Sequence, residues 1–172
     1  LIAPGCTLGV TDRDSTVYLN SKGVRNIDDP VPVTNNDSYA LFSCTTSLTL
    51  LGALILYEQG KLQLDIPVST YFPEIANIGV LEPGAVDKYS GKLSKPLTTP
   101  QTPITAKHLI THTAGFSYGF ISPDYFALIT KGERIDAINP PMEFFHKKTP
   151  LIHEPGTDWA YGHNIDWLGF VL

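Results

Sequence analysis

A run of apolar residues at 48–57, broken only by Thr49 and Gly52, marks the longest helix that the sequence predicts. The run is far shorter than the roughly 20 residues that a membrane-spanning helix needs, so we expect a buried helix of a globular domain. The helix begins near Ser43 and ends at Gly60, a residue suited to the left-handed conformation that closes many helices. The 172 residues, 42% of them hydrophobic, are enough for one domain with its own core.

Ser43 and Thr46 stand at the head of this predicted helix, in the segment Phe42-Ser43-Cys44-Thr45-Thr46. Positions i and i+3 of a helix lie on the same face, with roughly 5–6 Å between their Cβ atoms. A serine hydroxyl is a weak nucleophile and needs an adjacent base, the part that a lysine plays in Ser-x-x-Lys enzymes. A threonine hydroxyl has no useful basicity near neutral pH, so Thr46 cannot take the proton of Ser43.

Four segments carry a family resemblance in order along the chain. They are Pro4-Gly5 before a first strand, FSCTTSLTLLGALILYEQGKLQLDIPVSTYFPE at 42–74, HLITHTAGF at 108–116 and EPGTDWAYGHNIDWLG at 154–169. Together they resemble the serine β-lactamase-like superfamily, in its class C, esterase and transesterase branch. The resemblance implies an α+β fold of the β-lactamase/transpeptidase type, in which an antiparallel sheet is flanked by helices and an all-helical subdomain. We expect this chain to supply an incomplete portion of that fold.

The resemblance also implies a mechanism, acyl transfer through an ester on Ser43. Tyr161 stands at the tyrosine position of the family's second motif, Tyr-x-Asn or Tyr-x-Ser, and is the implied partner base. A tyrosine has an ordinary pKa of about 10, and a neighbouring lysine cation favours the phenolate in this chemistry. Because Thr46 supplies no cation, Tyr161 is expected to stay mostly neutral. General acid–base assistance contributes about 10²–10⁴-fold, so its loss predicts slow turnover at best.

The second motif departs from the family pattern at its third position, where His163 replaces Asn or Ser. His163 is able to donate a hydrogen bond to a substrate carbonyl, or to act as a substitute base for Ser43. A polar pocket wall or a surface residue is the favoured interpretation, because this position points at substrate in the family. Asn164 is a candidate for the missing amide after a one-residue shift. Both residues are predicted substrate contacts, whereas His112 is assigned a structural part in the wall of the active site.

Three functional classes stay open at this point. The first is an active serine hydrolase or acyltransferase for a small-molecule ester, thioester or lactam, with Thr46 either tolerated or engineered. The second is a noncatalytic relative that binds a ligand or partner in the same cleft. The third is a reshaped catalyst that works without an acyl-enzyme. The flanks of Ser43 and Tyr161 favour the first class, and the absent lysine favours the second.

The charge pattern and the cysteines argue against several other classes of protein. A formal net charge of -5 without a basic run argues against nucleic acid and against a membrane surface as partners. Cys6 and Cys44 make neither a zinc site nor a disulfide framework, and Cys44 is expected to pack as a small buried apolar residue. The five histidines are not spaced for metal, so we predict no metal and no cofactor. No signal peptide is visible, which favours a soluble, cytoplasmic protein.

Turn and loop signals divide the chain into four parts. Residues 1–42 hold edge strands at 6–10 and 15–22 and a loop, residues 43–81 the nucleophile helix and the loop after it, residues 82–103 a surface loop, and residues 104–172 a helical subdomain with the tyrosine motif. Within the last part, Thr105 is the predicted N-cap of a helix at 106–111. Further helices are predicted at 125–130, at 141–147 and from Asn164 onward.

The resembled family has a third motif, Lys-Thr-Gly or a variant of it, that has no counterpart in this sequence. The last residues, 166–172, continue an apolar helical pattern without a stop signal. Two edge strands without neighbours leave backbone pairing groups and an apolar face exposed. We therefore expect the remainder of the domain to accompany this chain as a second polypeptide, an untraced segment or a swapped copy.

Overall fold

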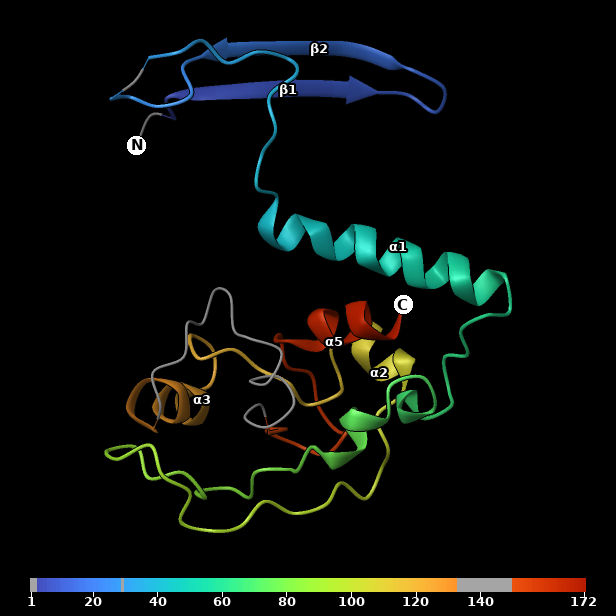
Figure 1. Ribbon diagram of the computed structural model, residues 1–172, viewed down its shortest axis with the longest axis vertical. Coiled ribbons are helices and arrows are strands. Elements are labelled where there is room, and N and C mark those ends of the chain that lie inside the picture. The colour runs from blue at the N-terminus through green and yellow to red at the C-terminus, as the bar shows by residue number, and fades with distance from the viewer. Residues whose placement is uncertain (1–2, 29, 133–149) are drawn as a thin grey trace. The chain divides into compact units, whose positions relative to one another are not determined.

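A computed structural model describes residues 3–28, 30–132 and 150–172 of the protein. The chain forms two compact units, Leu1–Phe42 and Ser43–Leu172 (Figure 1). The first unit holds a two-stranded antiparallel sheet, and the helices lie in the second unit, so the chain is α+β as expected. The helix predicted at 141–147 falls outside the described residues.

The sheet of the first unit consists of β1 (Gly5–Thr11) and β2 (Thr16–Gly23), which confirms the strands predicted at 6–10 and 15–22. The antiparallel register starts with Gly5 opposite Gly23. Gly23 has a positive φ of 95°, and a Cβ atom at this position would lie 2.2 Å from the carbonyl oxygen of Pro4. Only glycine therefore allows the two strand ends to approach so closely.

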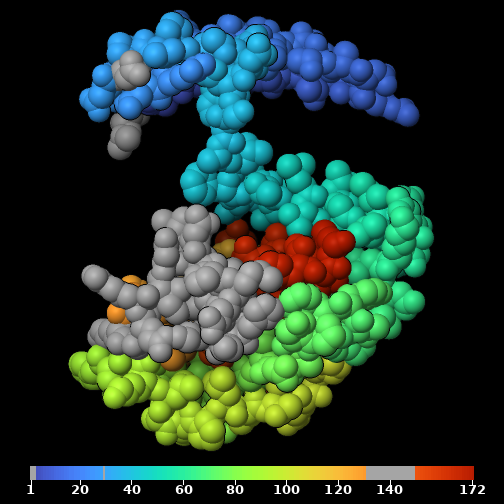
Figure 2. Space-filling model, in the orientation of Figure 1, coloured from blue at the N-terminus to red at the C-terminus, as the bar shows by residue number. Residues whose placement is uncertain are grey.

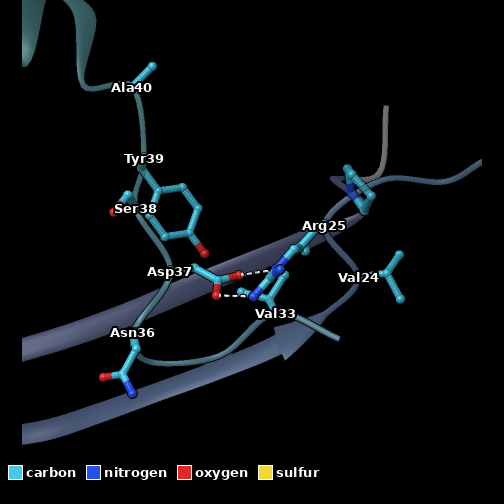
Figure 3. A pocket seen from close by; sticks show the side chains of 10 residues that line it. Val24, Arg25, Val33, Asn36, Asp37, Ser38, Tyr39 and Ala40 are labelled. Carbon is cyan, nitrogen blue, oxygen red and sulfur yellow. Dashed lines mark hydrogen bonds and ion pairs between the residues drawn. The ribbon is translucent and has the colours of Figure 1, made fainter. Parts of the chain in front are cut away.

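Arg25 and Asp37 form a bidentate ion pair beside a pocket of about 540 Å³ in the first unit (Figure 3). Arg25 donates from Nε and Nη2 to the two carboxylate oxygens at 2.8 and 2.7 Å. The hydroxyl of Thr34 donates to the same carboxylate at 2.7 Å. These hydrogen bonds, the one from Arg25 first, lower the pKa of Asp37 to about 2. The pair joins the two ends of the loop that follows β2.

Helix α1 (Thr45–Glu58) follows a 3₁₀ turn, η1 (Phe42–Cys44). The chain leaves the helix as predicted at Gly60, whose φ of 71° is left-handed. The expectation of a buried helix is wrong. Of the residues of α1, all of which the structure describes, Ala53 alone is buried, while Leu51 and Leu54 are 54% and 46% exposed. Apolar residues lie on all sides of the helix, but the rest of the second unit packs against only one side of it.

Helix α5 (Asn164–Val171) supplies the centre of the core of the second unit, with Trp167 and Leu168 fully buried. The ring of Trp167 stacks on that of Phe116, with the centroids 5.6 Å apart. The helix packs against α1 and against α2 (Ala106–Ile110), and Figure 2 shows its red surface beside the teal surface of α1. A helix that opens at residue 164 was predicted and is confirmed.

Thr105 is the N-cap of α2, as predicted. Its hydroxyl accepts a hydrogen bond from the backbone N–H of His108 at 3.2 Å, and Nδ1 of His108 accepts one from the Thr105 N–H at 3.3 Å. This reciprocal pair is a capping box with histidine in the usual place of glutamate. The helix predicted at 125–130 begins earlier, as α3 (Pro123–Ala127), and continues as a π-helical turn, η4 (Leu128–Gly132).

The remaining segments of the second unit are short helices and a loop. Two 3₁₀ helices follow α1, namely η2 (Val68–Thr70) and η3 (Pro73–Asn77). Residues 82–103, all of them described, form no helix or strand, in line with the predicted loop. An isolated bridge from Val80 to Thr98 fixes the course of this loop. No helix in the described part of the chain is long and apolar enough to cross a membrane.

Candidate active site

Ser43 lies in the turn η1 directly before α1 and is exposed, and Thr46, within the first turn of α1, is half-buried. Cys44 is the N-cap of α1 and makes no capping hydrogen bond through its side chain. Free backbone N–H groups at a helix head and the helix dipole both favour negative charge. This end of α1 is therefore suited to an oxyanion, the species that forms when a serine attacks a carbonyl group.

Two further residues characterise this turn. Phe42, directly before Ser43, has a positive φ of 47°, a strained conformation for a bulky side chain. Backbone strain of this kind gathers at functional sites, where the surrounding structure holds it in place. Cys44 is exposed, so the expectation that it packs as a buried apolar residue is wrong. The turn at Cys44 precedes the part of α1 that packs on the core, which begins at Leu50.

Tyr161 lies half-buried in the segment directly before α5, between two aromatic rings. Its ring centroid is 4.9 Å from that of His112 and 5.6 Å from that of Tyr118, and the second contact is edge-to-face. A Cβ atom on the next residue, Gly162, would lie 2.3 Å from Cα of Ser117. Glycine at 162 therefore lets the backbone beside Tyr161 lie directly against the backbone of Ser117.

His163 is buried, with 4% of its surface exposed, so it is not the surface residue that one interpretation of the sequence allowed. Its Nδ1 lies 3.2 Å from Oδ2 of Asp166, and its ring meets that of Tyr118 edge-to-face at 4.4 Å. The hydroxyl of Tyr118 donates to the same carboxylate oxygen at 3.4 Å. Burial, and then the charge of Asp166, raises the pKa of Tyr118 well above its ordinary value, so Tyr118 stays a neutral phenol.

Asn164 is fully buried as the first residue of α5. Its Nδ2 donates to the carbonyl oxygen of Ala160 at 3.1 Å and lies 3.1 Å from Nδ1 of His112. Because these two contacts occupy the side-chain N–H groups, the placement of Asn164 fits an internal link better than contact with a ligand. The substrate contacts inferred for His163 and Asn164 from the sequence stay predictions.

The sequence assigns His112 a structural part in the wall of the active site but does not reveal its contacts. His112 follows α2, has a positive φ of 57°, and contacts both Tyr161 and Asn164. Burial lowers the pKa of His112 below its ordinary value, so the ring is neutral at pH 7. The signal in the sequence is its place in HLITHTAGF, which through the family resemblance indicates a structural part in the active-site wall but names no partner.

The structure thus brings three of the five predicted site residues, Tyr161, His163 and Asn164, into one cluster. Ser43 and Thr46 lie apart from it on the turn and helix that open the second unit. Among the described residues, no hydrogen bond or ring contact joins either of them to Tyr161. Nor does any group of three metal-ligating side chains occur in the described ranges of the chain.

Comparisons with known proteins relate these residues to a family. The family model named Beta-lactamase matches residues 2–172. The chain is 34% identical over 171 residues to lovastatin esterase of Penicillium rubens, covering 98% of this chain and 42% of the relative. It is 33% identical over 132 residues to monacolin J acid methylbutanoyltransferase of Aspergillus terreus, covering 77% of this chain and 30% of the relative.

A solved structure gives the same relation at the level of the fold. Unliganded simvastatin synthase from Aspergillus terreus matches with a TM-score of 0.77 at 28% sequence identity, covering 98% of this chain and 43% of that one. Some curated relatives match 98% of this chain. The chain spans only about 40% of the length of these relatives.

Proposed function

The chain belongs to the Beta-lactamase family, and we propose that it forms part of a serine hydrolase or acyltransferase whose nucleophile is Ser43. The family and an incomplete portion of its α+β fold, both expected from the sequence, are confirmed. Relatives named as an esterase and as a methylbutanoyltransferase support acyl transfer as the chemistry. The proposed substrate is a small-molecule ester, thioester or lactam.

In the proposed reaction, the hydroxyl oxygen of Ser43 attacks the carbonyl carbon of an ester, and its proton passes to the phenolate form of Tyr161, which becomes a neutral phenol. The carbonyl oxygen becomes an oxyanion, stabilised by the backbone N–H of Ser43 and by a second N–H from the remainder of the domain. Collapse of this intermediate breaks the bond to the alcohol, which leaves with the proton, and the acyl group stays on Ser43. Water or another alcohol then releases the acyl group by the same steps in reverse.

The observation that carries the proposal is the position of Ser43, exposed in the turn that leads into the first turn of α1. In that place the hydroxyl is accessible, and the backbone N–H groups that stabilise an oxyanion are close in sequence. The strained backbone of Phe42, directly before it, supports the same site. An exposed serine elsewhere on a helix surface offers no such donors.

Thr46 supports a second candidate function, a noncatalytic relative that binds acyl compounds without transferring the acyl group. It stands one helical turn from Ser43, where a base is needed, and its hydroxyl does not accept a proton near neutral pH. The two candidates differ in whether an acyl group is transferred to Ser43. In the first, the expected turnover is slow because position 46 carries no lysine to favour the phenolate of Tyr161.

The proposal includes a partner for this chain, namely the remainder of the domain. α1 leaves apolar side chains such as Leu51, Leu54 and Ile55 exposed, more than an isolated surface helix normally carries. The relatives are more than twice as long as the part that matches this chain. The remaining residues of the domain, in the same or another polypeptide, are proposed to cover this face.

A fluorophosphonate probe tests the proposed nucleophile in the full-length protein, because this electrophile needs little help from a base. The expected result is slow labelling of Ser43, identified by peptide mass spectrometry and absent from Ser43→Ala. The labelling rate should rise with pH, and Tyr161→Phe should flatten that rise. No label on Ser43 at any pH, together with reversible binding of small acyl compounds measured by calorimetry, would favour the noncatalytic function.

A further inference from the structure

The peptide unit before Tyr161 is held from two directions. The backbone N–H of Ala160 donates to the carbonyl oxygen of His112 at 2.9 Å. The carbonyl oxygen of Ala160 accepts from Nδ2 of Asn164 at 3.1 Å. Both polar groups of this buried residue are therefore satisfied by residues that also contact each other through their side chains. The position of Tyr161 follows from these links.

The amide of Asn164 determines which nitrogen of the His112 ring carries the proton. The bond to the carbonyl of Ala160 fixes Nδ2 on that side, because a flipped amide would place Oδ1 against a carbonyl oxygen. The second N–H of Nδ2 is then available to Nδ1 of His112, 3.1 Å away, so Nδ1 acts as the acceptor. The proton of the neutral ring must therefore be on Nε2.

The ring of His112 is fixed by further contacts. It packs at 4.9 Å on the ring of Tyr161 and edge-to-face at 6.2 Å on that of Trp159. Its backbone adopts a φ of 57°, which a residue other than glycine keeps only where the surrounding structure holds it. The backbone conformation, the ring contacts and the side-chain hydrogen bond of His112 thus all hold it against the segment that carries Tyr161.

We propose that His112 is a positioning residue for Tyr161, and that Asn164 holds the His112 ring in the neutral form with its proton on Nε2. The catalytic consequence rests on the proposed function, in which Tyr161 is the base. A neutral imidazole orients the phenol without placing a cation beside it. His112 therefore does not supply the positive charge that a lysine at position 46 would provide. The slow turnover expected for the proposed function follows from the absent lysine and the neutral His112 together.

The charge state of His112 depends on few neighbours. Burial disfavours the imidazolium form, which lowers the pKa of His112. Protonation at Nδ1 would also oppose the N–H of Asn164. Three sets of titratable groups lie on the segments packed against it. Tyr161 is in ring contact, His163 and Asp166 contact each other at the start of α5, and Lys107 and His108 lie on α2.

NMR spectroscopy of the full-length protein with ¹⁵N-labelled histidine tests this proposal without any need for catalysis. The expected spectrum has the proton of His112 on Nε2, and His112 stays neutral as the pH falls through 6.5, the ordinary value for histidine. In Asn164→Asp, a carboxylate replaces the donor, so the proton should move to Nδ1 and the midpoint of titration should rise by about 1–3 pH units. The ring signals of Tyr161 should follow that titration in the variant only, while those of the distant buried Tyr125 stay constant.

Two results would overturn the inference. One is a proton on Nδ1 of His112 in the unaltered protein, which needs no variant and no folding control. The other is a His112 that titrates near pH 6.5 with the Tyr161 signals following it in the unaltered protein. Neither result touches the labelling of Ser43, so failure of this inference and failure of the proposed function are seen separately.

Discussion

The head of α1 and the cluster around Tyr161 represent two different ways of building a site. Ser43 is exposed in a short turn, whereas Tyr161 is flanked by the buried residues His163 and Asn164 and fixed by ring contacts. The proposed chemistry at the head of α1 depends on one or two side chains. The cluster fixes the position of Tyr161, because neighbouring residues hold each side chain of the cluster in place. On the proposed mechanism, threonine instead of lysine at position 46 is therefore expected to weaken the chemistry at the head of α1 while the fold of the cluster is kept.

The largest effect is expected from Thr46→Lys in the full-length protein. A lysine one turn from Ser43 supplies the missing base, and hydrolysis of a small chromogenic ester should rise by about 10²–10⁴-fold. Thr49→Lys is the matched control, because it adds the same charge to α1 off the face of Ser43, and it should leave the rate unchanged. Adding Ser43→Ala to Thr46→Lys should abolish the gain.

A folded Thr46→Lys protein with unchanged activity would contradict this account of the head of α1. The limiting defect would then lie in the third motif or in His163. The head of α1 would no longer be the region that limits the reaction, and the contrast with the cluster around Tyr161 would fail. Circular dichroism and a urea transition identify whether the variant is folded, so that the kinetic result is read only on native protein.

The next effect concerns the apolar face of α1. If the remainder of the domain covers this face, Leu54→Ala in the full-length protein removes a buried side chain and should lower the free energy of unfolding by about 2–5 kcal/mol. Leu93→Ala is the control, since Leu93 is similarly exposed in this chain, at 44%, but lies in the loop at 82–103. Equal urea midpoints for the two variants would show that nothing covers α1.

Asn164→Ala should have a smaller effect, on stability. The change strands the carbonyl of Ala160 and Nδ1 of His112, which are both linked to Nδ2 of Asn164. Leaving buried polar groups unsatisfied costs about 1–3 kcal/mol, so the urea midpoint should fall accordingly. An unchanged midpoint would mean that the cluster around Tyr161 is held by its ring contacts alone.

Local signals in the sequence predicted much of the fold. Some features depend only on neighbouring residues, and the structure has them where they were expected. They are the N-cap at Thr105, the end of α1 at Gly60 and the two strands on either side of the turn near residues 11–15. The burial of α1 was predicted wrongly because apolar residues lie on all sides of the helix. Such a pattern does not tell which side meets a partner.

The candidate site divides in the same way. Ser43 and Tyr161 were found through short motifs, whose spacing is visible in the sequence. The motif HLITHTAGF gave His112 a structural part but not its partner, because Asn164 lies 52 residues further along the chain and the contact depends on how α2 and α5 pack. The positive φ of His112 also leaves no mark in the residue type, since glycine is the usual sign of that conformation.

The smallest effect is expected from Ser43→Ala, and it completes the contrast with Asn164→Ala. Ser43 is exposed and its side chain makes no hydrogen bond within the described residues, so the free energy of unfolding should change by no more than about 0.5 kcal/mol. Labelling by the fluorophosphonate probe should nevertheless be lost completely. A loss of more than about 1 kcal/mol would give Ser43 a structural part, because truncating an exposed side chain to its Cβ atom removes little else. Full labelling of the variant would instead place the reactive group on another residue, and Ser43 at the head of α1 would not be the nucleophile.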